Sequence, residues 1–200
     1  MSKVHNTFYI NSKERFAQIK LNKIFHELIA NIEKPFEKVA IVCIGTDRST
    51  GDSFGPLVGY FLSQYKRLYS FDIYGTIHDP VHALNLEATL LNIDTSNTLT
   101  IAVDSALGKI ENIGCIMTSY DPIYPGSGVG KKLPPVGDIQ LSGIVNMSGF
   151  MPFALLQCTS LGLVYHMAKM AAWTVIHACS QSPLKEKIYI YRRQNISALV

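Results

Sequence analysis

Charged residues and cysteine motifs are both scarce in this sequence, and each scarcity excludes a class of protein. Charged residues make up only 16% of the 200 residues and hydrophobic residues 48%, which excludes the composition of a disordered chain. The four cysteines are widely separated, with no C-x-x-C spacing, so neither a disulfide framework nor a zinc ribbon is indicated. We therefore expect reduced cysteines in the core of a cytoplasmic protein.

Long apolar runs and basic clusters are also missing. No stretch approaches the roughly 18 apolar residues that indicate a membrane span, and the N-terminus shows no signal-peptide pattern. The formal net charge of +3 is spread thinly along the chain, which predicts no nucleic-acid partner. The sequence thus predicts a protein without membrane association, and it leaves homo-oligomerisation open.

The sequence does contain alternating helix-like and strand-like segments, which fit one α/β domain over residues 1–200. Helical periodicity is seen over residues 16–32, through Leu57, Phe61 and Leu68, and over 82–93 and 155–178. Strand-like runs cover residues 38–44, 71–77, 99–103, 114–119, 139–145 and 188–191. This alternation predicts a three-layer fold, in which a mostly parallel sheet carries helices on both faces.

Acidic residues follow three of the predicted strands. Asp47 and Asp52 come after the strand over 38–44, Asp79 follows the strand over 71–77, and Asp104 directly follows the strand over 99–103. Ligands collect beyond the carboxyl ends of parallel strands, so at least two of these carboxylates should share one crevice. Paired carboxylates can share a proton, with one acting as a base and the other as a donor. The alternative for Asp52 is a helix N-cap.

Two further motifs fit known functional loops only in part. Gly51-Asp-Ser53-Phe-Gly55 fits the G-x-S-x-G nucleophile elbow, but an elbow follows its strand at once and the predicted strand ends near Ile44. The run PGSGVGK at 125–131 lacks the spacing of a Walker phosphate loop. Its backbone N–H groups form either an anion-binding nest or a simple turn.

Four segments together resemble the sporulation protein YyaC family: CIGTDRSTGDSFGP at 43–56, GTIHDPVHALNL at 75–86, VDSALG at 103–108 and PGSGVG at 125–130. Members of that family are regarded as spore proteases, similar to the germination protease that degrades small acid-soluble spore proteins. The resemblance implies a phosphorylase/hydrolase-like fold and places Asp52 and Asp104 on the two acidic positions thought essential in the germination protease.

A more distant resemblance links the same two positions to the metal-contacting acids of hydrogenase maturation peptidases. Those enzymes add a histidine at the entry to a later helix, whereas residues 158–162 here contain none. We therefore expect no metal and no cofactor.

By resemblance, the expected activity is that of an endopeptidase, a hydrolase that cleaves a spore protein or proprotein with Asp52 and Asp104 as catalytic residues. The residues expected to contact the peptide substrate are Asp47, Ser53, His78, Asp79, Gly126, Ser127 and Gly128. Two alternatives stay open. The first is a non-catalytic, peptide-binding sporulation protein, and the second is a serine hydrolase that uses Ser53.

Overall fold

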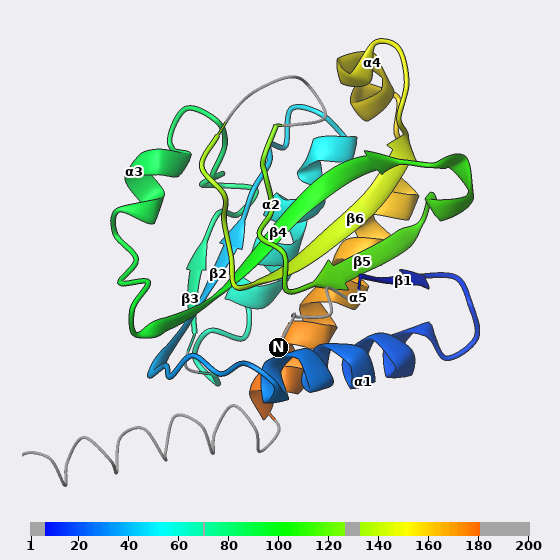
Figure 1. Ribbon diagram of the computed structural model, residues 1–200. Helices are drawn as coiled ribbons and strands as arrows, with labels where there is room; N and C mark the ends of the chain where they lie inside the picture. Colours follow the sequence, from blue (N-terminus) through cyan, green and yellow to red (C-terminus); the bar gives the residue numbers. More distant parts are fainter. Residues whose placement is uncertain (1–6, 70, 127–132, 181–200) are drawn as a thin grey trace, which may run out of the picture.

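The computed structural model describes residues 7–69, 71–126 and 133–180, and these form a six-stranded sheet with helices packed on it (Figure 1). The strands lie in the order β1-β5-β6-β4-β2-β3. Their bounds are β1 Phe8–Asn11, β2 Lys38–Cys43, β3 Asp72–Tyr74, β4 Thr98–Gly108, β5 Cys115–Ser119 and β6 Ile139–Met147. The helices are α1 Ala17–Ala30, α2 Phe54–Ser63, α3 Leu86–Leu90, α4 Pro152–Gln157 and α5 Leu161–Ser180, with 3₁₀ turns η1 Gly51–Ser53 and η2 Ile110–Asn112.

The centre of the sheet is parallel, as the alternation of strands and helices predicts. β2 pairs in parallel with β3 and β4, and β4 pairs in parallel with β6. β5 and β1 are antiparallel additions at one edge. All residues of β2 after Lys38 are buried, which explains why this strand has a continuous apolar sequence and no alternation. The predicted mostly parallel α/β sheet is confirmed.

The two faces of the sheet carry separate cores. Helices α1, α2 and α5 cover one face, where Phe25 and Phe54 are fully buried in the larger core (Figure 1). The opposite face carries a smaller core around Val42 and Ala102, which Leu86 of the short helix α3 and Val136 of a loop cover. The predicted three-layer arrangement is therefore confirmed, with a thinner layer on the side of α3.

Several predicted boundaries are wrong, and one of them changes the setting of Asp104. The helix predicted through Leu68 ends at Ser63, and both β3 and α3 are shorter than the segments predicted over 71–77 and 82–93. β4 runs past the predicted end at Val103, because it continues to pair with β6 after β2 has ended. Asp104 therefore lies inside a strand and not beyond its end.

Most of the remaining predicted elements are present, and one strand was not expected. The predicted helix over 16–32 and the strands over 38–44, 114–119 and 139–145 correspond to α1, β2, β5 and β6, whereas β1 was not expected. The long helix predicted over 155–178 is interrupted between α4 and α5, where the Thr159 hydroxyl donates to the Leu155 carbonyl over 2.8 Å. The strand expected over 188–191 lies outside the described residues.

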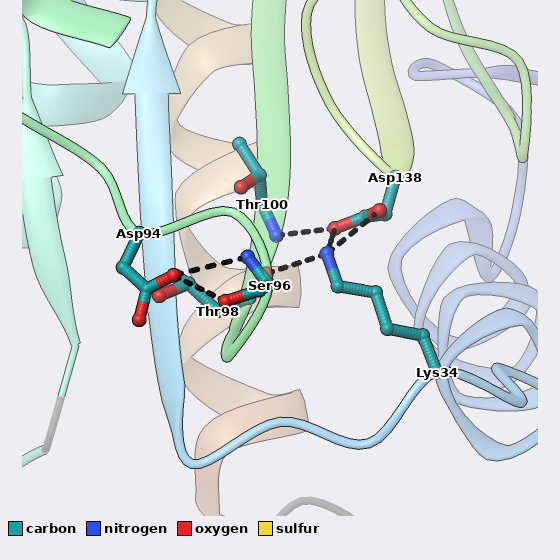
Figure 2. Close-up of polar contacts among 6 residues, drawn as sticks. All are labelled: Lys34, Asp94, Ser96, Thr98, Thr100 and Asp138. Carbon is teal, nitrogen blue, oxygen red and sulfur yellow. Dashed lines mark hydrogen bonds and ion pairs between the residues drawn. The ribbon is translucent and has the colours of Figure 1, made fainter. Parts of the chain in front are cut away.

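An ion pair ties together the amino ends of the central strands (Figure 2). Lys34, which precedes β2, donates to Asp138 Oδ2 over 2.9 Å and to the carbonyl of Thr98 over 2.8 Å. Asp138 Oδ2 also accepts the backbone N–H of Thr100 over 2.8 Å. In the turn before β4, the N–H and hydroxyl of Ser96 donate to Asp94. These contacts stabilise the end of the sheet that lies opposite the carboxyl ends of its parallel strands.

The cysteines are free thiols in different environments. Cys43 at the end of β2 is fully buried, and this burial raises the pKa of its thiol. Cys158 is exposed, so the prediction that the cysteines lie in the core is wrong for this residue. Among the helices of the described segments, none has the length and apolar character required to cross a bilayer.

Candidate active site

The chain turns sharply at Gly45, directly beyond β2. The Gly45 N–H donates to the Val81 carbonyl over 2.8 Å, and the Thr46 N–H donates to the Asp52 carbonyl over 3.1 Å. Gly45 has φ +138°, and a Cβ atom here would lie 2.0 Å from the Asp52 carbonyl oxygen. Only glycine fits this position, and the tight turn brings Asp52 back to the end of β2.

Asp52 and Asp104 are brought together by the different lengths of β2 and β4. β2 pairs with β4 only as far as Val103, and the turn η1 that carries Asp52 then lies beside the remainder of β4. Ser105 contacts both acids, because its backbone N–H donates to Asp104 Oδ1 over 2.7 Å and its hydroxyl donates to Asp52 Oδ1 over 3.3 Å. The prediction that these two acids, far apart in sequence, meet in space is confirmed.

The electrostatic environment of Asp52 and Asp104 favours the binding of one proton by the two carboxyl groups. Asp104 is only 7% exposed, and burial raises the pKa of its carboxyl well above the ordinary aspartate value. The negative charge of Asp52 raises this pKa further, while the hydrogen bond from the Ser105 N–H lowers it. The protonated form of Asp104 is therefore favoured next to a second carboxyl group, which is the arrangement that paired acid–base chemistry requires.

A cavity of about 350 Å³, here called the first cavity, opens on the β2 side of the acid pair. Its walls are largely apolar and include Ile44, Leu84, Leu133, Phe153 and Leu156. Arg48 and His82 also line it, together with Asp52 and Asp104. The Leu84 N–H donates to His82 Nδ1 over 3.3 Å, so the neutral ring of His82 carries its proton on Nε2 and presents it as a donor.

A second cavity of about 380 Å³ opens on the other side, over β4, β6 and β5. It shares Asp52, Asp104, Gly126 and Leu156 with the first cavity, so the acid pair lies where the two cavities meet. Besides these shared residues, its lining includes Ser105, Met117, Asp121, Tyr124, Gln140 and Ser142.

The floor of the second cavity is a hydrogen-bonded polar row on buried strands. Ser142, which pairs in register with Asp104, donates its hydroxyl to Gln140 Oε1 over 3.1 Å. Gln140 Nε2 donates to the Ser119 hydroxyl over 2.7 Å, and the Ser119 hydroxyl lies 3.2 Å from Asp121 Oδ2 as its donor. A buried row of this kind holds its side chains in fixed orientations.

Helix α4 forms a wall of the site through Leu156, which lines both cavities, and Phe153, which lines the first. Asn146 of β6 fixes this wall, since its Nδ2 donates to the Leu155 carbonyl over 2.9 Å and contacts Thr159 Oγ1 at 3.3 Å. The left-handed backbone of Met151, with φ 59°, precedes the helix.

The remaining predicted site residues are distributed unevenly. Gly126 lines both cavities, whereas Asp47, His78 and Asp79 are exposed and line neither of them. The ring of His78 contacts that of Tyr60 edge-on, with 5.8 Å between centroids. Ser127 and Gly128 lie outside the described residues.

Ser53 is buried, lines neither cavity and donates its hydroxyl to the Thr50 carbonyl over 2.7 Å. Asp52 is not a helix N-cap, because the cap positions of η1 and α2 are Thr50 and Ser53, and neither of these caps through its side chain.

Two polar residues of the cavities were not predicted from the sequence: Arg48 and Asp121. Arg48 lies in the same loop as Asp52, and His82 follows Val81, which forms a parallel bridge with Ile44. Within residues 7–69, 71–126 and 133–180, no three His, Cys, Asp or Glu side chains form a group that could hold a metal ion.

Comparisons with known proteins identify relatives of this chain. A family described as "Protein of unknown function (DUF1256)" matches residues 9–174. The chain is 49% identical over 136 residues to a Bacillus subtilis (strain 168) protein described as "Uncharacterized protein YyaC". This match covers 67% of the chain and 66% of that protein, which is slightly less than two thirds of the relative's length.

Proposed function

Because the chain belongs to the DUF1256 family, whose description assigns no activity, we propose its function from its own site: an endopeptidase of the germination-protease type. Its substrate is a spore protein or proprotein, as the resemblance of the sequence motifs implies. The observation that carries this proposal is the contact of Asp52 and Asp104 through Ser105 at the junction of two cavities. A peptide that crosses both cavities brings one of its bonds to the acid pair.

In the proposed mechanism, Asp52 acts as the base and Asp104 as the acid. Asp52 accepts a proton from a water molecule while the water oxygen attacks the carbonyl carbon of the peptide bond. Asp104, whose raised pKa favours its protonated form, donates its proton to the carbonyl oxygen and so assists the attack. The C–N bond then breaks: the amine leaves with the proton that Asp52 has taken up, and a hydroxyl of the tetrahedral intermediate returns a proton to Asp104. The backbone N–H of Gly126, which lines both cavities, is a proposed further donor to the same oxygen.

A non-catalytic, peptide-binding role is the second candidate, and the same two cavities support it because they provide walls for side chains on both sides of a peptide. A serine hydrolase is less well supported. The Ser53 hydroxyl is directed to the Thr50 carbonyl and lies outside the lining of both cavities.

The test is to incubate the purified protein with an extract of sporulating cells and to identify new peptide termini by mass spectrometry. The Asp104→Asn variant is the matched control, since asparagine has nearly the same shape and no titrating group. New termini that arise with wild type and not with the variant support the peptidase. If peptides are retained by both proteins and no new termini arise, the peptide-binding role replaces it.

A further inference from the structure

A group of large apolar side chains is exposed on helix α4 and just before it. α4 stands out from the body of the protein beyond the end of β6 (Figure 1). Met147 ends β6, Phe150 and Met151 follow it, and Phe153 lies in the first turn of α4. Their exposed fractions are 38%, 98%, 69% and 57%, respectively. These four side chains are called the α4 patch below.

The α4 patch is large enough to form the apolar part of a protein interface. A fully exposed side chain of this size presents about 200 Å² to water, so the four together expose about 500 Å². A standard interface buries about 800 Å² on each partner, and in homodimers about 65% of this area is non-polar. The patch thus supplies nearly all the apolar area that a stable homodimer requires. Contiguous apolar surface of this extent marks an interaction site on a protein that folds in water.

The segment that carries the α4 patch is uncharged. No Asp, Glu, Lys or Arg occurs between Asp138 and Lys169, and all four side chains lie within this stretch. The loop before η1, a turn that contacts α4, exposes Asp47 and Arg48, which have opposite signs. Phe and Met are enriched at the centres of interfaces, and charged residues are depleted there. A patch without net charge meets a copy of itself without repulsion, whereas a strongly acidic or basic partner finds no counter-charge on it.

We propose that the α4 patch is the contact surface for a second copy of this chain, in a dimer with two-fold symmetry. Two-fold symmetry places the patch of one copy against the same patch of the other. Phe150, the most exposed member, lies near the axis. Phe153 belongs both to the patch and to the lining of the first cavity, so the second copy lies at the rim of the candidate active site. The proposal goes beyond the peptidase and does not depend on it.

The experiment measures the mass of the full-length protein by analytical ultracentrifugation over a wide range of protein concentration. Wild type should change from monomer to dimer as the concentration rises. Phe150→Asp should raise the dissociation constant of the dimer by about 100-fold or more, because each dimer loses two central side chains. Met151→Gly should raise it by about 10-fold, and glycine fits the left-handed backbone at this position. The matched controls Leu68→Asp and Leu91→Asp change exposed leucines of other surfaces and should dimerise like wild type.

A pair of charge variants tests the symmetry. Phe150→Asp and Phe150→Lys should each be monomeric alone and should form a dimer when mixed, because opposite charges then meet across the axis. Circular dichroism and thermal unfolding should show that every variant is folded like wild type, since Phe150 and Met151 are largely exposed.

Three outcomes would overturn the proposal. Wild type that stays monomeric at every concentration would leave the α4 patch to a different protein or to another segment of the chain. A dimer that persists in both Phe150→Asp and Met151→Gly would form through another face. A mixture of Phe150→Asp and Phe150→Lys that stays monomeric would show that Phe150 does not face its own copy across a two-fold axis.

Discussion

The hydroxyl of Ser105 donates to Asp52 Oδ1 over 3.3 Å, although the two residues are 53 positions apart in the chain. A residue of β4 thus binds the carboxylate of the turn η1, although α2, β3 and α3 lie between them in the chain. The same serine also binds Asp104 through its backbone N–H, so the backbone contact survives any change of its side chain.

Ser105→Ala is therefore expected to disturb Asp52 and leave the N–H contact to Asp104 in place. We expect kcat to fall by about 10-fold with little change in KM, because a hydrogen bond to a charged group contributes about 1.5–3 kcal/mol and this one is long. The pH profile of kcat/KM should shift on its acidic limb, where Asp52 takes up a proton as the proposed base. Ser63→Ala, an exposed serine of α2, is the control and should change neither value.

Asp104→Asn is expected to reduce peptidase activity by a factor of ~10²–10⁴, the usual contribution of a positioned acid or base. The fold should be retained, because the amide has nearly the same size as the carboxyl group. Steady-state kinetics on the best substrate measure the loss. Activity within a factor of two of wild type would exclude Asp104 as the acid.

The same variant changes the pH dependence of stability. Burial and the charge of Asp52 raise the folded-state pKa of Asp104, so the folded state binds this proton more tightly than the unfolded chain does. The resulting stabilisation is complete below the pKa of the unfolded chain and is lost as the pH rises towards the raised folded-state pKa. Thermal unfolding from about pH 4 upward should show this loss in wild type and not in Asp104→Asn. Equal slopes for the two proteins would show that Asp104 titrates normally.

Gly45→Ala should misplace Asp52. The added Cβ atom would lie 2.0 Å from the Asp52 carbonyl oxygen, and φ is +138° at this position, so the turn has to open. We expect both a lower Tm and a loss of activity. Gly162→Ala in α5 is the matched control, because its Cβ atom would meet only Ser160 Oγ at 3.9 Å, and it should be neutral or stabilising by up to ~1 kcal/mol.

Ser53 is expected to be unreactive towards a fluorophosphonate probe, because its hydroxyl donates to the Thr50 carbonyl and is buried. Ser53→Ala should keep peptidase activity and lose about 1 kcal/mol of unfolding free energy, the net value of one hydrogen bond. Labelling is measured by intact-protein mass spectrometry. Stoichiometric labelling that disappears in Ser53→Ala would revive the serine hydrolase.

EDTA is expected to leave the activity unchanged. The donors at the acid pair are carboxylate oxygens, whereas zinc and nickel prefer imidazole and thiolate ligands. His82 is the imidazole in the same cavity, and its Nδ1 already accepts the Leu84 N–H. Activity lost to EDTA and restored by zinc or nickel, with one metal ion per chain by elemental analysis, would contradict this prediction and make His78 or His82 the candidate ligand.

The parallel sheet and the meeting of the two acids could be predicted because both depend on local patterns. The buried runs of β2 and β4 are β-branched and apolar, and an acid comes soon after the predicted end of each. The extension of β4 could not be predicted, because the polar residues Asp104 and Ser105 indicate the end of a buried strand. The strand continues beyond them because it pairs with β6.

The residues that line the cavities could not be predicted from sequence patterns, for a different reason. Leu84 and Phe153 are mostly exposed, so no burial pattern marks them as part of a site. Asp121 follows β5, which is antiparallel to β6, and the rule for the carboxyl ends of parallel strands does not apply to it. The bridge between Ile123 and Val136 shows how the chain beyond β5 folds back towards the site.

Because Cys43 is buried and Cys158 is exposed, the reactivity of the two thiols can be used to measure local opening of the protein. Cys158 is exposed and should react with an alkylating reagent in the native state. Burial of Cys43 keeps the reagent away from its thiol and, by raising the pKa, disfavours the reactive thiolate. The Cys43 side chain lies in the larger core beneath α2, where a Cβ atom on Gly59 would be 3.4 Å from the Cys43 Cβ, so its thiol becomes accessible when α2 separates from the sheet. Its slow alkylation would therefore measure how often the helix that follows Asp52 opens away from the sheet.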